Sequence, residues 1–313
     1  MSVRKNDKKV PSSDGIHTLS GVVYIPDGAI KGIVQVVHGM KEYIGRYDNF
    51  MTELAENGYI VFGHDHLGHG RTAGKDELGF IAHKDGWKHL VDDVGVFGSE
   101  VKKELEPLIA ERNGDKKKVP YILFGHSMGS FVVRLAAEKF DRYDKLIVMG
   151  TGGPNPATGA GIAFLKMDVA LKGERHFSKT ANKLVFGSYN DRFKGEDGTA
   201  WLSVNRQNVE KYDNDPSCRY NFSASAMLDL LHLVKESNSG RWFSSVNKTM
   251  PILLTAGGED PVGSYGEGVR TVYDRLAKNG ANVTIKLYDG YRHEILNDYC
   301  SEQVIKDILE FIA

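Results

Sequence analysis

Residues 119–137 read VPYILFGHSMGSFVVRLAA, and the architecture of the chain can be worked out from this segment. An apolar run up to Phe124 precedes the pentapeptide GHSMG at residues 125–129, and a segment that favours helix follows it. A sharp turn between a strand and a helix holds a serine hydroxyl clear of its own backbone, and glycines on either side leave room for neighbouring chains. The segment therefore predicts a buried strand, a tight turn and a helix, with Ser127 as a candidate nucleophile.

Short apolar runs alternate with longer amphipathic segments along most of the chain. The runs predict buried strands at 32–37, 59–63, 121–124, 146–149, 252–255 and 283–287. The amphipathic segments predict helices at 47–57, 87–108, 127–139, 266–278 and 302–311. Such alternation is typical of an α/β fold, in which helices flank a mostly parallel central sheet. Residues 17–25 alternate well enough to predict an outer, antiparallel strand.

The alternation stops between residues 154 and 249. A gap of this length between neighbouring strands requires a separate layer of structure. Within it, residues 161–171 and 222–234 are apolar with helical period, and Gly, Asn, Asp and Ser clusters separate them. We therefore expect an α/β core made of residues 1–153 and 250–313, with residues 154–249 inserted as a helical cap over the carboxyl edge of the sheet.

A serine nucleophile needs a base within hydrogen-bonding reach, and a carboxylate must hold that base in the right tautomer. Asp260 and His293 each follow a predicted strand, and the chain order Ser, Asp, His is the order found in α/β-hydrolases. Ser127, Asp260 and His293 are therefore the candidate catalytic residues. Glu259 and Asp289 lie close by in the sequence and remain alternatives for the acid.

The oxyanion of an acyl-transfer intermediate needs two backbone N–H donors, one directly after the nucleophile and one in a loop after an early strand. Met128 follows the nucleophile. The early strand at 32–37 ends in His38-Gly39-Met40, so the amides of Met40 and Met128 are the predicted donors.

Two motifs allow other interpretations. Ser127 could serve only as the N-cap of the following helix. The run HDHLGH at residues 64–69 has the side chains of a zinc site. A tight turn at Gly68-x-Gly70 favours loop hydrogen bonds near the rim of the active site instead, so we expect no metal.

Composition narrows the range of partners and locations. The chain has 313 residues, with 40 Lys and Arg against 41 Asp and Glu, and this balance gives no reason to expect nucleic acid as a partner. Cys218 and Cys300 are too few for a disulfide scaffold, and the amino terminus lacks the apolar segment of a secretory signal. We expect a cytoplasmic protein. No run reaches the ~20 apolar residues of a membrane span, so any membrane contact is expected to be peripheral, through the cap.

Several motifs together carry a resemblance to a known family. They are His38-Gly39-Met40-x-Glu42, Arg46-Tyr47, Asp65-His66-x-Gly68-His69-Gly70, Gly125-His126-Ser127-Met128-Gly129-Ser130, Asp260-Pro261-Val262 and Arg292-His293-Glu294, with Trp201-Leu202-Ser203 and Asp215-Pro216-x-Cys218 in the inserted segment. The chain resembles the monoacylglycerol lipase and lysophospholipase branch of the α/β-hydrolases, also described as serine aminopeptidase-like hydrolases. The resemblance implies hydrolysis of a small-molecule carboxylic ester, with a medium or long acyl chain bound under the cap and no organic cofactor.

The sequence leaves other functions open. A peptidase, an amidase or a short-chain carboxylesterase can use the same fold and triad, and so can a hydrolase-shaped protein that only binds a ligand. An acidic subsite for a free amino terminus would favour a peptidase, whereas an apolar tunnel would favour a lipase. The apolar cap residues could line such a tunnel or hold the cap together; they are Phe164, Leu165, Phe222, Met227 and Leu230.

Overall fold

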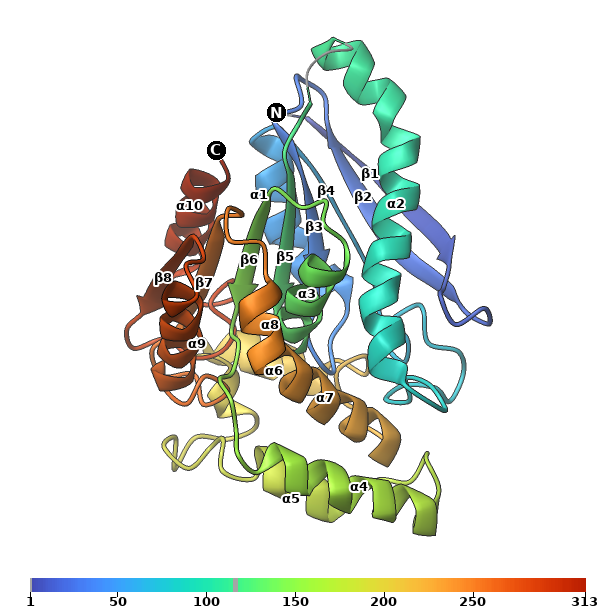
Figure 1. Ribbon diagram of the computed structural model, residues 1–313, viewed down its shortest axis with the longest axis vertical. Coiled ribbons are helices and arrows are strands. Elements are labelled where there is room, and N and C mark those ends of the chain that lie inside the picture. Colours follow the sequence, from blue (N-terminus) through green and yellow to red (C-terminus); the bar gives the residue numbers. More distant parts are fainter. Residues whose placement is uncertain (1, 115–117) are drawn as a thin grey trace.

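A computed structural model describes residues 2–114 and 118–313. In this part of the chain, eight strands form one twisted sheet with the order β1-β2-β4-β3-β5-β6-β7-β8 (Figure 1). The strands are β1 (Val3–Pro11), β2 (Thr18–Pro26), β3 (Gly32–Val37), β4 (Tyr59–His64), β5 (Tyr121–His126), β6 (Lys145–Met149), β7 (Ile252–Gly257) and β8 (Val283–Tyr288). From β4 to β8 every neighbouring pair is parallel, so the carboxyl ends of these strands share one edge.

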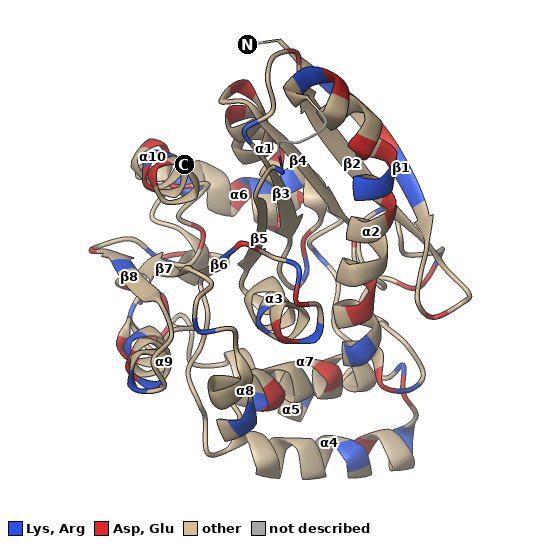
Figure 2. Cartoon of the chain, turned by 45° about the horizontal axis from the view of Figure 1, so that its top comes forward, with Lys and Arg blue, Asp and Glu red and all other residues tan. Residues whose placement is uncertain are grey.

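The first two strands run antiparallel to their neighbours. β2 pairs with β1 on one side and with β4 on the other, so the strand predicted at 17–25 is antiparallel as expected, but it is not the outer strand of the sheet. β1 was not predicted, because the run VRKNDKKVP lacks the apolar alternation that marks a half-buried strand. It forms the exposed edge of the sheet, and Figure 2 marks the charged residues along it. Charged side chains on an edge strand discourage pairing with another chain.

Helices cover both faces of the sheet because alternate residues of each strand point to opposite sides. In β5, Ile122 and Phe124 join one apolar cluster, with helices α1 (Asp48–Glu56) and α10 (Ser301–Ile312). Tyr121 and Leu123 join the other, which the remaining core helices cover. These are α2 (Gly86–Asn113), α3 (Met128–Lys139) and α9 (Glu267–Lys278).

Between β6 and β7 the chain leaves the sheet and forms a mainly helical segment. Its helices are α4 (Thr158–Lys172), α5 (Lys179–Phe186), α6 (Arg206–Asn214), α7 (Ala224–Ser237) and α8 (Gly240–Ser245), with a short 3₁₀ turn η2 (Ala200–Leu202). α7 packs against α3 on one side and α4 on the other, so α4 lies farther from the sheet (Figure 1). We use the name cap for residues 154–249.

Candidate active site

Ser127 lies at the turn between β5 and α3, as the sequence predicts. Its backbone has φ 55° and ψ −122°, a conformation that residues other than glycine rarely adopt. Its amide donates to the Met149 carbonyl at 2.9 Å, which ties the turn to the neighbouring strand. A Cβ at Gly125 would overlap the Gly129 carbonyl, and one at Gly129 would overlap the Val37 carbonyl. Both glycines are therefore required by close backbone approach.

The structure brings His293 and Asp260 together. His293 Nδ1 donates to Asp260 Oδ2 at 2.8 Å, and both side chains are buried. Asp260 Oδ1 accepts the Val262 amide at 2.9 Å, which fixes the carboxylate. The two alternative acids lie elsewhere: Glu259 is directed to Arg192 at 3.6 Å, and Asp289 is exposed.

Ser127 and His293 line one cavity of about 880 Å³, together with Met40 and Met128. Within the described residues, the Ser127 hydroxyl makes no hydrogen bond to the His293 imidazole. In enzymes without substrate such contacts are often long, and they tighten when substrate binds. The arrangement therefore places a hydroxyl and an imidazole at a single cavity, with the buried Asp260 carboxylate in contact with the imidazole behind it.

The loop that carries Met40 runs directly past the serine. A Cβ at Gly39 would lie 2.9 Å from Ser127 Cβ, so the backbone here approaches the nucleophile more closely than a residue with a side chain would allow. His38 holds this loop from behind, because its Nδ1 donates to the Gly39 carbonyl at 2.8 Å and its Nε2 accepts the His66 amide at 3.0 Å. Burial lowers the pKa of His38 to about 3, so the ring is neutral and keeps both contacts.

The histidines of residues 64–69 pack behind the same loop. Gly68 and Gly70 both have positive φ, and His69 Nδ1 donates to the Leu67 carbonyl at 2.9 Å, so the turn uses a side chain for a loop hydrogen bond. Across the described residues, no three His, Cys, Asp or Glu side chains are arranged to hold a metal ion. The free thiols of Cys218 and Cys300 are buried.

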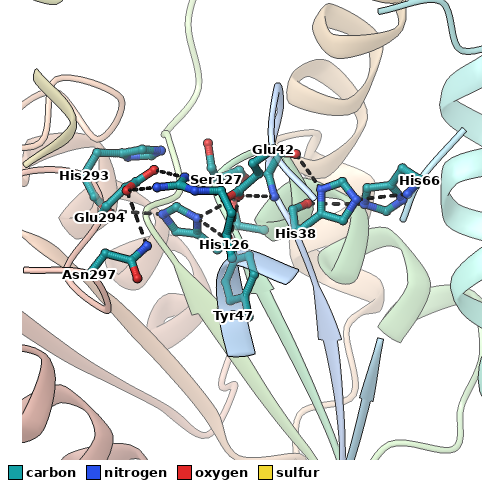
Figure 3. Close-up of polar contacts among 12 residues, drawn as sticks. His38, Glu42, Tyr47, His66, His126, Ser127, His293, Glu294 and Asn297 are labelled. Atoms are coloured by element: carbon teal, nitrogen blue, oxygen red, sulfur yellow. Dashed lines mark hydrogen bonds and ion pairs between the residues drawn. The ribbon is translucent and has the colours of Figure 1, made fainter. Parts of the chain in front are cut away.

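Sequence reasoning missed a buried network of charged groups next to the serine (Figure 3). Arg46 binds Glu294 through two hydrogen bonds of 2.5 and 2.8 Å, and its Nη1 lies 3.3 Å from Glu42 Oε2. Tyr47 donates its hydroxyl to Glu42 Oε1 at 2.7 Å and lies 2.7 Å from His126 Nδ1. Glu42 and Arg46 are four residues apart, but nothing in the sequence shows that Glu294 meets them.

The network fixes the protonation of His126. A tyrosine hydroxyl that donates to a carboxylate can only accept from a second partner, so His126 Nδ1 donates to Tyr47. His126 Nε2 donates to the His293 carbonyl at 3.2 Å, which makes both ring nitrogens donors. Burial lowers the pKa of His126, but the hydrogen bond and negative charge of Glu42 outweigh burial and raise the pKa. A charged His126 therefore supports the backbone of His293, the candidate base, by donating to its carbonyl.

Apolar side chains from the cap form much of the remaining cavity wall. They come from α4, α5 and α7 and are Phe164, Val185, Phe186, Leu230, Leu231 and Val234. Phe164 and Leu230 thus line the cavity, and Leu230 also packs in the core. Leu165, Phe222 and Met227 belong instead to the packed core, which is the second role predicted for the apolar cap residues.

The chain is similar to known proteins in both sequence and structure. A family model described as "Serine aminopeptidase, S33" matches residues 28–299. The chain is 26% identical over 313 residues to the monoacylglycerol lipase of Mycolicibacterium smegmatis, a match that covers 97% of this chain and 99% of the relative. It is 25% identical over 302 residues to the monoglyceride lipase of Mus musculus, covering 93% of this chain and 87% of the relative.

Among solved structures, a highly thermostable carboxyl esterase from Bacillus coagulans in complex with glycerol superposes with a TM-score of 0.83. The two chains are 28% identical, and the superposition covers 100% of each. The similarity thus extends over the sheet, the flanking helices and the inserted segment alike.

Proposed function

Because this chain belongs to the serine aminopeptidase S33 family of α/β-hydrolases, we propose that it hydrolyses the carboxylic ester of a lipid whose acyl chain enters the cavity under the cap. The observation that carries the proposal is the cavity itself, which Ser127 and His293 share with apolar side chains of three cap helices. A volume of about 880 Å³ lies at the upper end of the range for small-molecule sites. It suits a medium or long acyl chain better than an acetyl group.

In the proposed mechanism, Ser127 attacks the ester carbonyl while His293 Nε2 takes the hydroxyl proton. His293 then returns that proton to the leaving alcohol, and Asp260 stabilises the imidazolium through Nδ1. The amides of Met40 and Met128 hold the oxyanion, each such donor contributing about 3 to 4 kcal/mol to the transition state. Water then attacks the acyl-enzyme by the same steps. Residues 154–249 act as the cap that encloses the acyl chain.

The names of the relatives favour monoacylglycerols as the substrates of this chain. The relatives in Mycolicibacterium smegmatis and Mus musculus are named for monoacylglycerol hydrolysis, and the Bacillus coagulans esterase was solved with glycerol bound. A peptidase would need a free carboxylate in the cavity to bind an amino terminus. Glu42 and Glu294 both line the cavity, but Arg46 already pairs with them. This pairing favours an ester substrate over a peptide.

The proposal includes peripheral contact with a lipid surface through the cap. Met167 and Leu171 on α4 and Leu184 on α5 are 58%, 75% and 74% exposed, and Leu184 also lines the cavity. Exposed apolar side chains next to a cavity opening can enter a lipid interface and admit substrate from it. In the described part of the chain, no helix is long and apolar enough to cross a bilayer.

A panel of substrates tests the proposal. It comprises p-nitrophenyl esters of increasing chain length, a monoacylglycerol, a lysophospholipid and aminoacyl amides, all assayed with the wild-type protein. We expect kcat/KM to rise from acetyl to medium-chain esters, with monoacylglycerol cleaved and the amides inert. Preference for aminoacyl amides would contradict the proposal, and a maximum at acetyl would point to a short-chain carboxylesterase.

A further inference from the structure

The turn that carries His293 is bound to the cap through the residue before it. Arg292 forms two hydrogen bonds with Glu196, of 2.8 and 2.7 Å, in the geometry of a guanidinium facing a carboxylate. The same Arg292 Nη1 donates to the Ala200 carbonyl at 2.7 Å. The guanidinium also lies over the Phe193 ring, 3.9 Å from its centre. The Arg292 side chain, which belongs to the core, thus contacts three cap residues between positions 193 and 200.

The residue after His293 is bound to the same segment of the cap. The Glu294 amide donates to the Leu202 carbonyl at 2.7 Å, and the Glu294 carboxylate accepts from Asn208 Nδ2 at 2.7 Å. Further along the turn, Asp298 accepts the Ser203 hydroxyl at 2.7 Å. The candidate base therefore sits between two residues that are both attached to cap residues 196–208.

Trp201 lies at the centre of this attached segment, and its ring packs against the His293 imidazole. The ring centres are 5.1 Å apart and the planes are inclined by 44°. Trp201 also lines the cavity, so the contact lies where substrate would bind. The contacts of Arg292 with Glu196 and the Ala200 carbonyl fix the backbone on which this tryptophan is carried.

We propose that Arg292 and Glu196 are positioning residues for the base: they hold Trp201 against the imidazole, so that the cap sets the orientation of His293. The proposal rests on the proposed function, because it assigns His293 the role of base. It gives the cap a part in the chemical step, in addition to enclosing the acyl chain. Misplacement of a reacting group by about 1 Å can cost about a hundredfold in rate.

The chemistry of Arg292 makes the proposal specific. A lysine keeps the positive charge, but its ammonium cannot form the paired contact with Glu196 while it also binds the Ala200 carbonyl and stacks on Phe193. Glu196 is 36% exposed at its side chain, so loss of its charge is a small change for the stability of the fold. Glu196→Gln therefore separates positioning from folding.

The test compares variants on p-nitrophenyl butyrate, a short ester that makes little use of the acyl pocket. We expect Glu196→Gln and Arg292→Lys to lower kcat by about tenfold to a hundredfold, with KM changed less than about twofold. Both variants should also slow the reaction of Ser127 with a fluorophosphonate by a similar factor. Trp201→Phe, which keeps an aromatic ring on the imidazole, should retain most of the rate, and Trp201→Ala should not.

Glu210→Gln is the matched control. Glu210 is exposed on α6 of the cap, and within the described residues its carboxylate forms no ion pair or hydrogen bond, so the rate should stay within about twofold of wild type. The proposal is overturned if folded Glu196→Gln keeps the wild-type kcat, if Glu210→Gln loses as much, or if the loss appears only in KM for long-chain esters. Should Arg292→Lys fail to fold, Glu196→Gln decides. Inactivity of the wild type on every ester would instead reject the proposed function.

Discussion

Ser127 keeps a positive φ because the strand before it and the helix after it are both fixed by packing. The Gly129 carbonyl approaches Gly125, and the Val37 carbonyl approaches Gly129, so closely that neither glycine could carry a side chain. The cost of such a conformation is of order 1 to 3 kcal/mol, and the surrounding structure must supply it. The strained conformation places the hydroxyl at the cavity. A serine that served only as a helix N-cap would not require this conformation, because N-cap residues ordinarily have extended backbone angles.

Gly39→Ala tests the oxyanion loop at the level of a single methyl group. The new Cβ would lie 2.5 Å from Glu42 Oε1 and 2.9 Å from Ser127 Cβ, so the loop must move and take the Met40 amide with it. We expect kcat for esters to fall by about a hundredfold, the loss typical of one oxyanion donor, while KM stays close to that of wild type. Steady-state kinetics and a thermal melt measure the two effects.

The matched control is Gly159→Ala, where a Cβ on α4 meets nothing within 4 Å. That variant should keep full activity and gain up to about 1 kcal/mol of stability, because alanine favours helix over glycine. Equal activity of Gly39→Ala and Gly159→Ala would show that the Met40 loop takes no part in the reaction.

Single residues could be predicted from the sequence where their position relative to a glycine or to the end of a strand identifies them. Ser127 stands between two glycines, and Asp260 and His293 each follow a strand, so the geometry of the sheet edge predicts where they meet. The pairing of Arg46 with Glu294 could not be predicted, because it depends on how the last loop folds back across the sheet. A run such as Arg292-His293-Glu294 shows the charges but not their partners.

The carboxyl ends of β3 and β4 bury four histidines, His38, His64, His66 and His69, behind the oxyanion loop. Burial lowers the pKa of His38 and His64 to about 3 and the pKa of His69 to about 4, against 6.5 for an exposed histidine. Below pH 6.5 the unfolded chain therefore binds protons at these histidines that the folded chain does not bind. Their contribution to the free energy of unfolding is fully present above pH 6.5 and is lost as the pH falls towards 4.

We expect the free energy of unfolding to decrease by several kcal/mol per pH unit between pH 6 and 4, since each such histidine contributes about 1.4 kcal/mol per unit. Urea unfolding at a series of pH values measures this slope. His64→Leu should fold, because neither nitrogen of His64 has a hydrogen-bond partner within the described residues. Its slope should be smaller by about one histidine's share, because one buried titrating group is removed. An unchanged slope in that variant would show that buried His64 is not responsible for acid sensitivity.

The core elements were predictable because apolar periodicity is strong in buried strands and in helices that face a sheet. β1 was not, because it is an exposed edge strand whose side chains carry charge. Helices α5, α6 and α8 were also missed. They are short, and their starts are marked only by the capping side chains of Ser178, Asn205 and Ser239, a signal that loops share.

In the whole molecule, the sheet edge carries the proposed reacting groups and the cap carries the apolar walls around them. The chain order Ser, Asp, His predicts the first part, since parallel strands end at one edge. For the cap, the sequence predicts only that a helical segment is inserted. Its contacts with the core could not be predicted, because they join distant residues, such as Arg292 and Glu196, which are 96 positions apart. Those contacts decide which cap side chains face the cavity and which face the core.

The exposed apolar side chains of the cap predict a difference between dissolved and membrane-bound substrate. Leu171→Glu should lower the hydrolysis of monoacylglycerol presented in phospholipid vesicles by about tenfold, because burial of a leucine side chain contributes about 1.5 to 3 kcal/mol. Hydrolysis of dissolved p-nitrophenyl butyrate should not change. Ile16→Glu is the control, since Ile16 is 79% exposed in the turn between β1 and β2, outside the cap. Equal effects of the two variants would contradict membrane contact through the cap.

Reaction with a fluorophosphonate, followed by peptide mass spectrometry, tests the account most directly, because it requires an activated serine at the cavity. We expect one phosphonyl group per chain, on the peptide that contains Ser127, together with complete loss of ester hydrolysis. Ser127→Ala should take up no label, and its hydrolysis of the best ester should fall by at least about 10⁴-fold. Labelling at another residue, or hydrolysis that persists in folded Ser127→Ala, would contradict the account.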